Sequence, residues 1–299
     1  MDGLLEMIAE ESAGARAPAI AAVAEAARQR HGDAIIAVLL YGSCLREGQV
    51  EGKIVDLYLL ADRYDRLHRS RIPRALNALL PPNVYYVAAT YEGRTVAAKY
   101  AIVTLAQFER LVSPRALQPY FWARFAQPAV ILWAACDVIR ERVAAALATA
   151  RRTMVSETLP LMSVPFTPAE LWSRAFAETY RAELRAERGD QAERLYRAYA
   201  DRYDRATRIL TREPSRAPSA AERRRAVARW RRRRVVGKAL SVLRLVKASF
   251  TFEDGAAYLM WKIRRHSGVE MELTPWQRRH PILASSVLAW RLYRAGGFR

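Results

Sequence analysis

The chain contains few of the residues from which disulfide frameworks and zinc sites are built. Its 299 residues include two cysteines, Cys44 and Cys136, and its four histidines do not have the spacing of metal ligands. No stretch reaches the roughly 18 uncharged apolar residues that a membrane-spanning helix needs. The first residues contain no basic segment before an apolar core, so no signal peptide is expected. We expect a soluble or peripheral protein of a reducing compartment.

Acidic residues are outnumbered by basic ones. The chain has 49 Lys and Arg against 30 Asp and Glu, which gives a formal net charge of +19. An excess of this size predicts an anionic partner, and nucleic acid, an acidic membrane surface and a phosphorylated substrate all fit it. Because 52% of the residues are hydrophobic, we expect a globular fold rather than disorder.

Strand and helix patterns alternate over about residues 1–135, and helical patterns alone follow over about 136–299. The periodicity predicts strands at 34–41, 54–60, 84–91, 95–103 and 129–133. It predicts helices at 3–30, 64–79, 137–158, 167–188, 190–212, 220–248, 251–265 and 279–294, with an interrupted helical stretch over 105–126. We therefore predict an α/β (α+β) fold in two domains: a mixed sheet with helices, then an all-α C-terminal region.

Residues 35–60, IIAVLLYGSCLREGQVEGKIVDLYLL, are the most informative stretch. An apolar strand leads directly into Gly42-Ser43, and a second apolar strand contains a single acid, Asp56. Backbone N–H groups of such a turn can face a triphosphate, and a nearby carboxylate can hold the metal ion that neutralises it. This layout is typical of a nucleotidyltransferase active site and predicts transfer of a nucleotide to an acceptor.

Asp56 is the residue on which this prediction depends. Side chains alternate along a strand, so Asp56 shares a face with Tyr58 while the opposite face is apolar. An unpaired charge inside an apolar strand is costly, and either a metal ion or an ion pair with a nearby arginine would explain it. Tyr58 also departs from the Asp-x-Asp pattern of two-metal enzymes. Either another carboxylate completes the site, or the fold has lost catalysis.

Several short segments follow the order found in one branch of the nucleotidyltransferase superfamily. They are Tyr41-Gly42-Ser43 with Val55-Asp56-Leu57, His68-Arg69-Ser70, residues 83–86, 99–103 and 121–130, and the helical segments 166–171 and 179–185. In these segments the chain resembles the mitochondrial-type phosphatidate cytidylyltransferases, the translocator assembly and maintenance family. It departs from that family at Ala101, Ala123 and Glu183, which stand where glycine, glycine and aspartate are usual.

The resemblance implies an enzyme that makes CDP-diacylglycerol and pyrophosphate from CTP and phosphatidic acid, with Mg²⁺ as cofactor. It implies catalytic roles for Asp56, Lys99 and Arg124, and metal binding by Asp56 and Glu183. The residues expected to bind the nucleotide or its phosphates are Gly42, Ser43, His68, Tyr180 and Arg185.

Four of these residues also have purely structural interpretations. Lys99 near a strand end can be a solvated lysine, and Arg124 can pair with a core acid. Glu183 and His68 can lie on solvated surfaces. The residue types alone do not separate these interpretations from the functional ones.

Basic residues are concentrated near the C-terminus. Between 221 and 248 there are eleven Lys or Arg and one acid, and Arg231–Arg234 is an unbroken run. The apolar residues around this run are Val235, Val236, Leu240, Val242, Leu243, Leu245 and Val246. A basic amphipathic helix suits an anionic membrane surface, where a lipid substrate lies, and equally a nucleic-acid backbone. It can also be docked on the protein with solvated arginines. The apolar segment 281–293 is too short to span a bilayer and could enter its interface.

Three functions therefore stand open. The first is a cytidylyltransferase in the cytoplasm, peripheral on the inner face of a bacterial membrane. The second is a nucleotidyltransferase that acts on RNA or a small molecule, and the third is an inactive fold relative that binds anionic lipid or nucleic acid. The resemblance favours lipid over nucleic acid as the partner.

Overall fold

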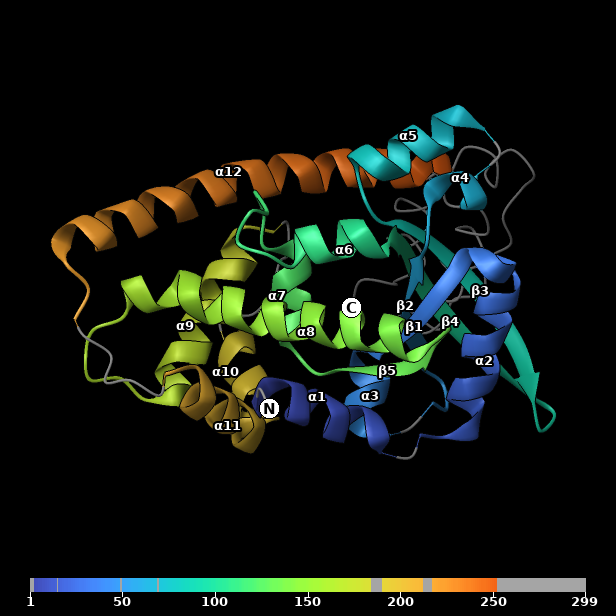
Figure 1. Cartoon of the computed structure of the whole chain (residues 1–299), viewed down its shortest axis with the longest axis horizontal. Helices are drawn as coiled ribbons and strands as arrows, with labels where there is room; N and C mark the ends of the chain where they lie inside the picture. The colour runs from blue at the N-terminus through green and yellow to red at the C-terminus, as the bar shows by residue number, and fades with distance from the viewer. Residues whose placement is uncertain are drawn as a thin grey trace, which may run out of the picture.

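The computed structural model describes residues 3–14, 16–48, 50–68, 70–183, 190–211 and 217–251. It confirms the predicted α/β class: a mixed five-stranded sheet has helices on both faces, and the chain continues into a helical region (Figure 1). Arg185, the segment 281–293 and the predicted helices 251–265 and 279–294 lie outside the described residues, apart from Thr251. No helix in the described part is long and apolar enough to cross a membrane.

The five predicted strands all form. They are β1 (Ile35–Tyr41), β2 (Ile54–Ala61), β3 (Asn83–Tyr91), β4 (Arg94–Thr104) and β5 (Ala129–Ala134), in the sheet order β3-β4-β2-β1-β5. β2 and β4 run parallel, and the other neighbours are antiparallel. Central strands covered on both faces need apolar residues on both, which explains the nearly continuous apolar sequences of β1 and β2.

Each face of the sheet has its own hydrophobic cluster. On one face, Val55, Leu57 and Leu59 of β2 pack with α2 (Pro18–Gln29). On the other face, Tyr58 and Leu60 belong to a larger cluster with α1 (Gly3–Ala13) and α8 (Asp137–Thr158). The two faces predicted for β2 are confirmed. The larger cluster includes residues from both sides of residue 135, so the sheet and the helical region share a core.

Three helices that periodicity predicts as continuous are divided. The stretch 3–30 forms α1 and α2, because proline lacks an N–H group and disfavours a helical residue before it; Ala17, before Pro18, has ψ 130°. The stretch 64–79 forms α4 (Tyr64–Leu67) and α5 (Arg71–Leu79). The stretch 190–212 forms α10 (Gln191–Arg197) and α11 (Ala200–Leu210), with a non-helical Tyr199 between them.

The remaining helices lie around the sheet or in the helical region. They are α3 (Ser43–Glu47), α6 (Leu105–Leu111), α7 (Tyr120–Ala126), α9 (Pro168–Arg181) and α12 (Ala220–Thr251), with short 3-10 turns at Gly32–Ala34 and Leu159–Leu161. α8 keeps its predicted bounds. α9 begins at the predicted capping box, in which Thr167 and Glu170 bond each other's backbone N–H, but it ends at Arg181 rather than near 188.

The basic helix α12 is docked along the molecule (Figure 1). Trp230 is fully buried against Trp122, with ring centroids 5.8 Å apart. Arg233 donates to Glu157 at 2.7 Å, and Arg234 donates to Glu178 at 2.6 Å. Part of the basic charge is thus used inside the protein, while a row of cations stays exposed on the outer side: Arg224, Arg225, Arg231, Arg232 and Lys238.

Candidate active site

The strand register brings the predicted turn and the predicted acid together. β1 ends at Tyr41, which pairs with Asp56 across the antiparallel β1–β2 ladder. Asp56 in turn lies opposite Lys99 in the parallel β2–β4 ladder. The three residues therefore form one row across the centre of the sheet, next to Gly42.

Gly42 leaves the space that the Asp56 carboxylate occupies. Its φ of +85° with ψ of −158° is a conformation that residues with a Cβ rarely adopt. A Cβ at position 42 would also lie 2.6 Å from the Oδ2 atom of Asp56. The Asp56 carboxylate thus lies close against the backbone of the turn.

Lys99 lies beside the same carboxylate. Its Nζ atom is 3.6 Å from Asp56 Oδ1, which is longer than a hydrogen bond, and the two side chains are 33% and 26% exposed. The ion pair that the sequence left open thus involves a lysine. A partly hydrated pair leaves the carboxylate able to exchange this partner for another cation.

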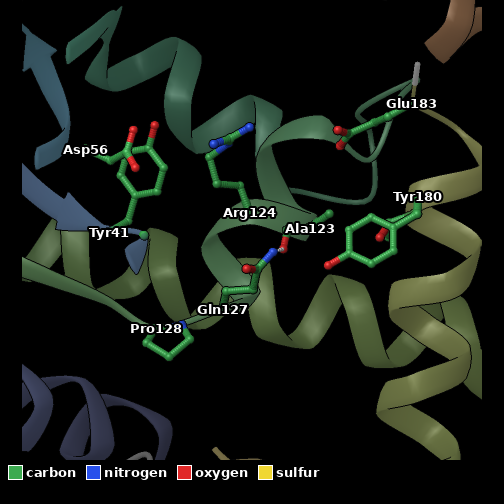
Figure 2. A pocket seen from close by; sticks show the side chains of 10 residues that line it. Tyr41, Asp56, Ala123, Arg124, Gln127, Pro128, Tyr180 and Glu183 are labelled. Atoms are coloured by element: carbon green, nitrogen blue, oxygen red, sulfur yellow. Dashed lines mark hydrogen bonds between the residues drawn. The ribbon is translucent and has the colours of Figure 1, made fainter. Parts of the chain in front are cut away.

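A cavity of about 170 Å³ opens beside this row, and Figure 2 shows its side chains. Asp56 and Tyr41 lie at one end of the view, Tyr180 and Glu183 lie at the other, and Arg124 lies between them. The lining residues are Tyr41, Gly42, Asp56, Ala123, Arg124, Gln127, Pro128, Thr179, Tyr180 and Glu183. Pockets for whole ligands usually measure roughly 300–1,000 Å³, so this cavity matches phosphate groups rather than an entire nucleotide.

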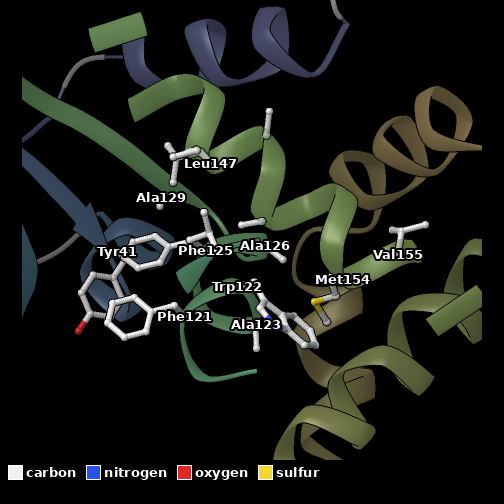
Figure 3. Close-up of a cluster of buried hydrophobic side chains, with 14 of the residues drawn as sticks. Tyr41, Phe121, Trp122, Ala123, Phe125, Ala126, Ala129, Leu147, Met154 and Val155 are labelled. Atoms are coloured by element: carbon white, nitrogen blue, oxygen red, sulfur yellow. The ribbon is translucent and has the colours of Figure 1, made fainter. Parts of the chain in front are cut away.

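Packing of α7 directs Arg124 into the cavity. Phe121, Trp122 and Phe125 of this helix lie among Tyr41 and the side chains of α8 (Figure 3) and are fully buried. Arg124 occupies the remaining side of the helix. Its guanidinium carbon lies 5.2 Å from the ring centre of Tyr41, and its Nε has no hydrogen-bond partner among the described residues. A half-buried guanidinium whose Nε donor has no partner in the described part of the chain is suited to an anionic ligand.

Tyr120 is placed between two arginines. Its ring centre lies 4.9 Å from the guanidinium of Arg124 and 4.5 Å from that of Arg244, on α12. Burial alone would raise the pKa of Tyr120, but the charges of Arg124 and Arg244, together with a smaller effect of Tyr58, outweigh burial and the net shift is downward. Arg244 is held from the other side, because it donates to the carbonyl of Pro81 and to Gln118. α12 is thereby connected to the cavity wall through one aromatic ring.

Most of the predicted site residues meet at this cavity. Gly42, Asp56, Arg124, Tyr180 and Glu183 line it, and Lys99 joins through Asp56. Ser43 follows Gly42 as the first residue of α3, but it is not among the lining residues.

His68 is separate from the cavity. It ends the short helix α4, and its Nε2 atom has no hydrogen-bond partner among the described residues. Burial, followed by the charge of Lys247, lowers the pKa of His68. His68 therefore neighbours the C-terminal part of α12, and the structure does not bring it to the predicted phosphate site.

Sequence reasoning assigned no separate role to Tyr41, Thr179, Gln127 or Arg244. Tyr41 directly precedes the glycine of the turn, which is the one signal for it in the sequence; its place beside Asp56 follows from the pairing of β1 with β2. Thr179 is one residue from the predicted Tyr180. For Arg244 the sequence contains no signal, because its contact with Tyr120 depends on how α12 docks.

The donors at the strand end fit a magnesium ion that arrives with a nucleotide. Within the described ranges, no three His, Cys, Asp or Glu side chains gather to hold a metal ion by themselves. Mg²⁺ commonly takes one or two protein carboxylates, with substrate phosphates and water as its other ligands. Asp56, which lines the cavity, fits this pattern as a single protein ligand. The described residues do not supply a complete set of protein ligands. Figure 2 shows Glu183 at the opposite end from Asp56.

No model of a known protein family matches the chain, and a search of curated proteins finds no similar one. The function is therefore argued from the geometry and charge of the cavity.

Proposed function

We propose that the chain is a phosphatidate cytidylyltransferase, which makes CDP-diacylglycerol and pyrophosphate from CTP and phosphatidic acid with Mg²⁺ as cofactor. The observation that carries the proposal is the contact of the Asp56 carboxylate with the Gly42 turn, at a cavity that also holds Arg124. A carboxylate, a backbone turn and a guanidinium around a phosphate-sized space are the parts that phosphoryl chemistry uses.

In the proposed reaction, a phosphate oxygen of phosphatidic acid attacks the α-phosphorus of CTP. The bond from that phosphorus to the bridging oxygen of the β-phosphate breaks, and pyrophosphate leaves with the electron pair. When bound, Mg²⁺ supplies neutralisation of the triphosphate charge. The chain contributes positions and charges, which are the main requirements of this chemistry.

The site residues predicted from the sequence have the following proposed roles. The backbone of Gly42 and Ser43 orients the β- and γ-phosphates, and Asp56 is the carboxylate ligand of the cation. Lys99 and Arg124 balance charge on the leaving pyrophosphate or on the lipid phosphate. Three predicted residues depend on further conditions. Glu183 serves as a second ligand of the cation if nucleotide binding draws it toward Asp56, and Tyr180 contacts the nucleotide if the cavity widens. His68 would reach only an acceptor that extends to α4.

The proposed location is the inner face of a bacterial membrane, where phosphatidic acid lies. α12 presents exposed Arg224, Arg225, Arg231 and Arg232, and such a row is attracted to anionic lipid by about 1 kcal/mol per cation near the surface. The same row also suits RNA, which is why the assay below includes it.

The experiment supplies purified protein with labelled CTP, Mg²⁺ and phosphatidic acid in mixed micelles. We expect a lipid-soluble labelled product that falls about a thousandfold in Asp56→Asn, because the loss removes the cation's carboxylate ligand. Asp62→Asn is the matched control, since Asp62 follows β2 on the surface and pairs with Arg66. Its turnover should stay within twofold.

The other outcomes identify the other functions. Label that enters added RNA indicates a nucleotidyltransferase acting on nucleic acid. Turnover of no nucleotide with any acceptor indicates an inactive relative. A magnesium titration of Glu183→Gln tests the second ligand: a raised magnesium requirement supports that role, and an unchanged one removes it.

A further inference from the structure

Helix α5 has its apolar side toward solvent. Ile72 and Leu79 are 72% and 76% exposed, and the exposed Ala75 lies between them on the same side of the helix. Asn77, on the other side, is fully buried. A surface helix of a globular protein normally has the opposite arrangement, with the apolar stripe facing the core.

The C-terminal half of α12 has the same inversion. Its inner side carries cations: Arg244 donates to the carbonyl of Pro81, and Lys247 donates to those of Leu80 and Pro82. Its outer side carries exposed aliphatic residues at helical spacing, namely Val235, Val242 and Leu243. They are 68%, 48% and 49% exposed.

The two inverted helices are neighbours. The carbonyls that Arg244 and Lys247 contact belong to residues 80–82, which directly follow α5. Figure 1 shows α5 beside the C-terminal part of α12, at the same edge of the molecule. Single exposed aliphatic residues are ordinary, but their repetition along two adjacent helices marks a surface that binds something apolar.

Charge identifies the partner. α5 contains Arg71 and Arg74 and no acid, and the exposed side of α12 adds Arg231, Arg232 and Lys238 beside the aliphatic residues. Aliphatic side chains bordered by cations match the surface of an anionic bilayer. The aliphatic groups can contact the acyl chains, and the cations can contact the phosphate headgroups above them. A protein partner would need an apolar patch with an acidic border.

We propose that the aliphatic residues of α5 and of the outer side of α12 form a face that inserts into the interface of an anionic bilayer. Membrane binding is part of the function proposed above, and this inference rests on it while naming the surface. The face reaches the cavity through Arg244, whose guanidinium touches both Pro81 beside α5 and Tyr120 beside Arg124.

The test measures binding to vesicles of phosphatidylcholine with phosphatidylglycerol. Ile72→Asp and Leu79→Asp should each weaken partitioning about tenfold, because an inserted aliphatic group is replaced by a charge. Val138→Asp is the matched control: Val138 is 64% exposed, lies in the first turn of α8 and makes the same change in net charge. It should weaken partitioning less than twofold. Thermal unfolding of each variant checks that the fold is kept.

A fluorophore placed by Leu79→Cys in a Cys136→Ser background adds a direct measurement. We expect its emission to shift to shorter wavelength on vesicle binding and to be quenched by lipids brominated on the acyl chains. Equal losses of partitioning in Ile72→Asp and Val138→Asp, or no quenching, would overturn the proposal. So would a wild-type dimer that becomes monomeric in Ile72→Asp, since the face would then be an interface between copies.

The vesicle experiment involves no turnover, so it can succeed where the cytidylyltransferase proposal fails. The converse case is also possible. If the protein turns over short-chain soluble phosphatidic acid but Ile72→Asp and Val138→Asp partition equally onto vesicles, the enzymatic proposal stands and the proposed membrane-binding face is wrong.

Discussion

The two ends of the cavity are built differently. Tyr41, Asp56 and Lys99 are paired across three neighbouring strands, and Gly42 directly follows Tyr41, so their separation is set by the hydrogen bonds of the sheet. At the opposite end, Tyr180 and Glu183 come from the end of α9 and the residues after it. Arg124, from α7, lies between the two ends. The strand end is assembled whenever the sheet forms, whereas the helix end depends on how separate helices pack.

The difference separates the chemical tasks. A rigid strand end suits a cation and phosphates, whose positions must be accurate to fractions of an ångström. A helix end whose walls are held by Arg244 and the docking of α12 can change when an acceptor or a membrane binds. The predictions below test this contrast.

The largest effect on stability is expected at Gly42. Gly42→Ala should lower the free energy of unfolding by about 3 kcal/mol, because the new Cβ meets Asp56 and the backbone is strained. It should also reduce turnover at least tenfold. Gly48→Ala is the matched control, since Gly48 has φ of +66° with open space around it, and it should cost about 1 kcal/mol. Urea unfolding of both variants gives the comparison, and equal losses would contradict the contact.

Arg124 tests the guanidinium between the two ends. Arg124→Lys keeps the charge but loses the planar fork of donors, so kcat/KM for CTP should fall about 100-fold, or about 2.7 kcal/mol. Arg115→Lys, on an exposed loop, serves as the control and should leave the kinetics unchanged. Steady-state kinetics with varied CTP check the prediction, and unaltered kinetics in Arg124→Lys would remove Arg124 from the proposed mechanism.

The substitution Gly237→Ala tests how α12 packs against α9 at the end of the cavity that helices form. Helix propensity alone predicts that Gly237→Ala stabilises an exposed helix by about 1 kcal/mol. Here the new Cβ would overlap the carbonyl oxygen of Ala182, at the end of α9 and next to Glu183. We therefore expect destabilisation by about 1–2 kcal/mol, measured by urea unfolding. A gain in stability would show that α12 and α9 do not meet in this way.

The smallest effect concerns the sheet face away from the cavity. His31 Nε2 lies 3.0 Å from the hydroxyl of Tyr100, and burial, with smaller effects of Arg30 and His68, lowers the pKa of His31 to about 4. The unfolded chain takes up this proton near pH 6.5, so between these values the unfolded state binds more protons. The contribution of His31 to the free energy of unfolding is therefore fully present above about pH 6.5 and is lost as the pH falls toward 4.

The expected loss between pH 7 and pH 4.5 is about 1 kcal/mol after allowance for partial exposure. Urea unfolding at pH 7, 5.5 and 4.5 measures it, and His31→Gln should flatten this part of the pH dependence. If the slope persists in His31→Gln, other groups cause it.

How much could be predicted from the sequence differs between the two ends. Alternation along β2 placed Asp56 on the face opposite Val55, Leu57 and Leu59, and Gly42-Ser43 indicated a turn at the end of the preceding strand. Both are local properties. The prediction of continuous helices over 3–30, 64–79 and 190–212 was wrong, because apolar spacing persists across residues at which the backbone leaves the helical conformation.

The amino-acid sequence by itself determined the α/β class, the five strands and the pairing of a glycine turn with a single acid, since period-two alternation and turn chemistry act over a few residues. Only the tertiary structure decided that Arg124 enters the cavity, that Arg244 reaches Tyr120 and that α5 turns its apolar side outward. The physical reason is that helix periodicity marks an apolar side but not what that side faces. The partner of a helix is chosen by packing between residues far apart in the chain.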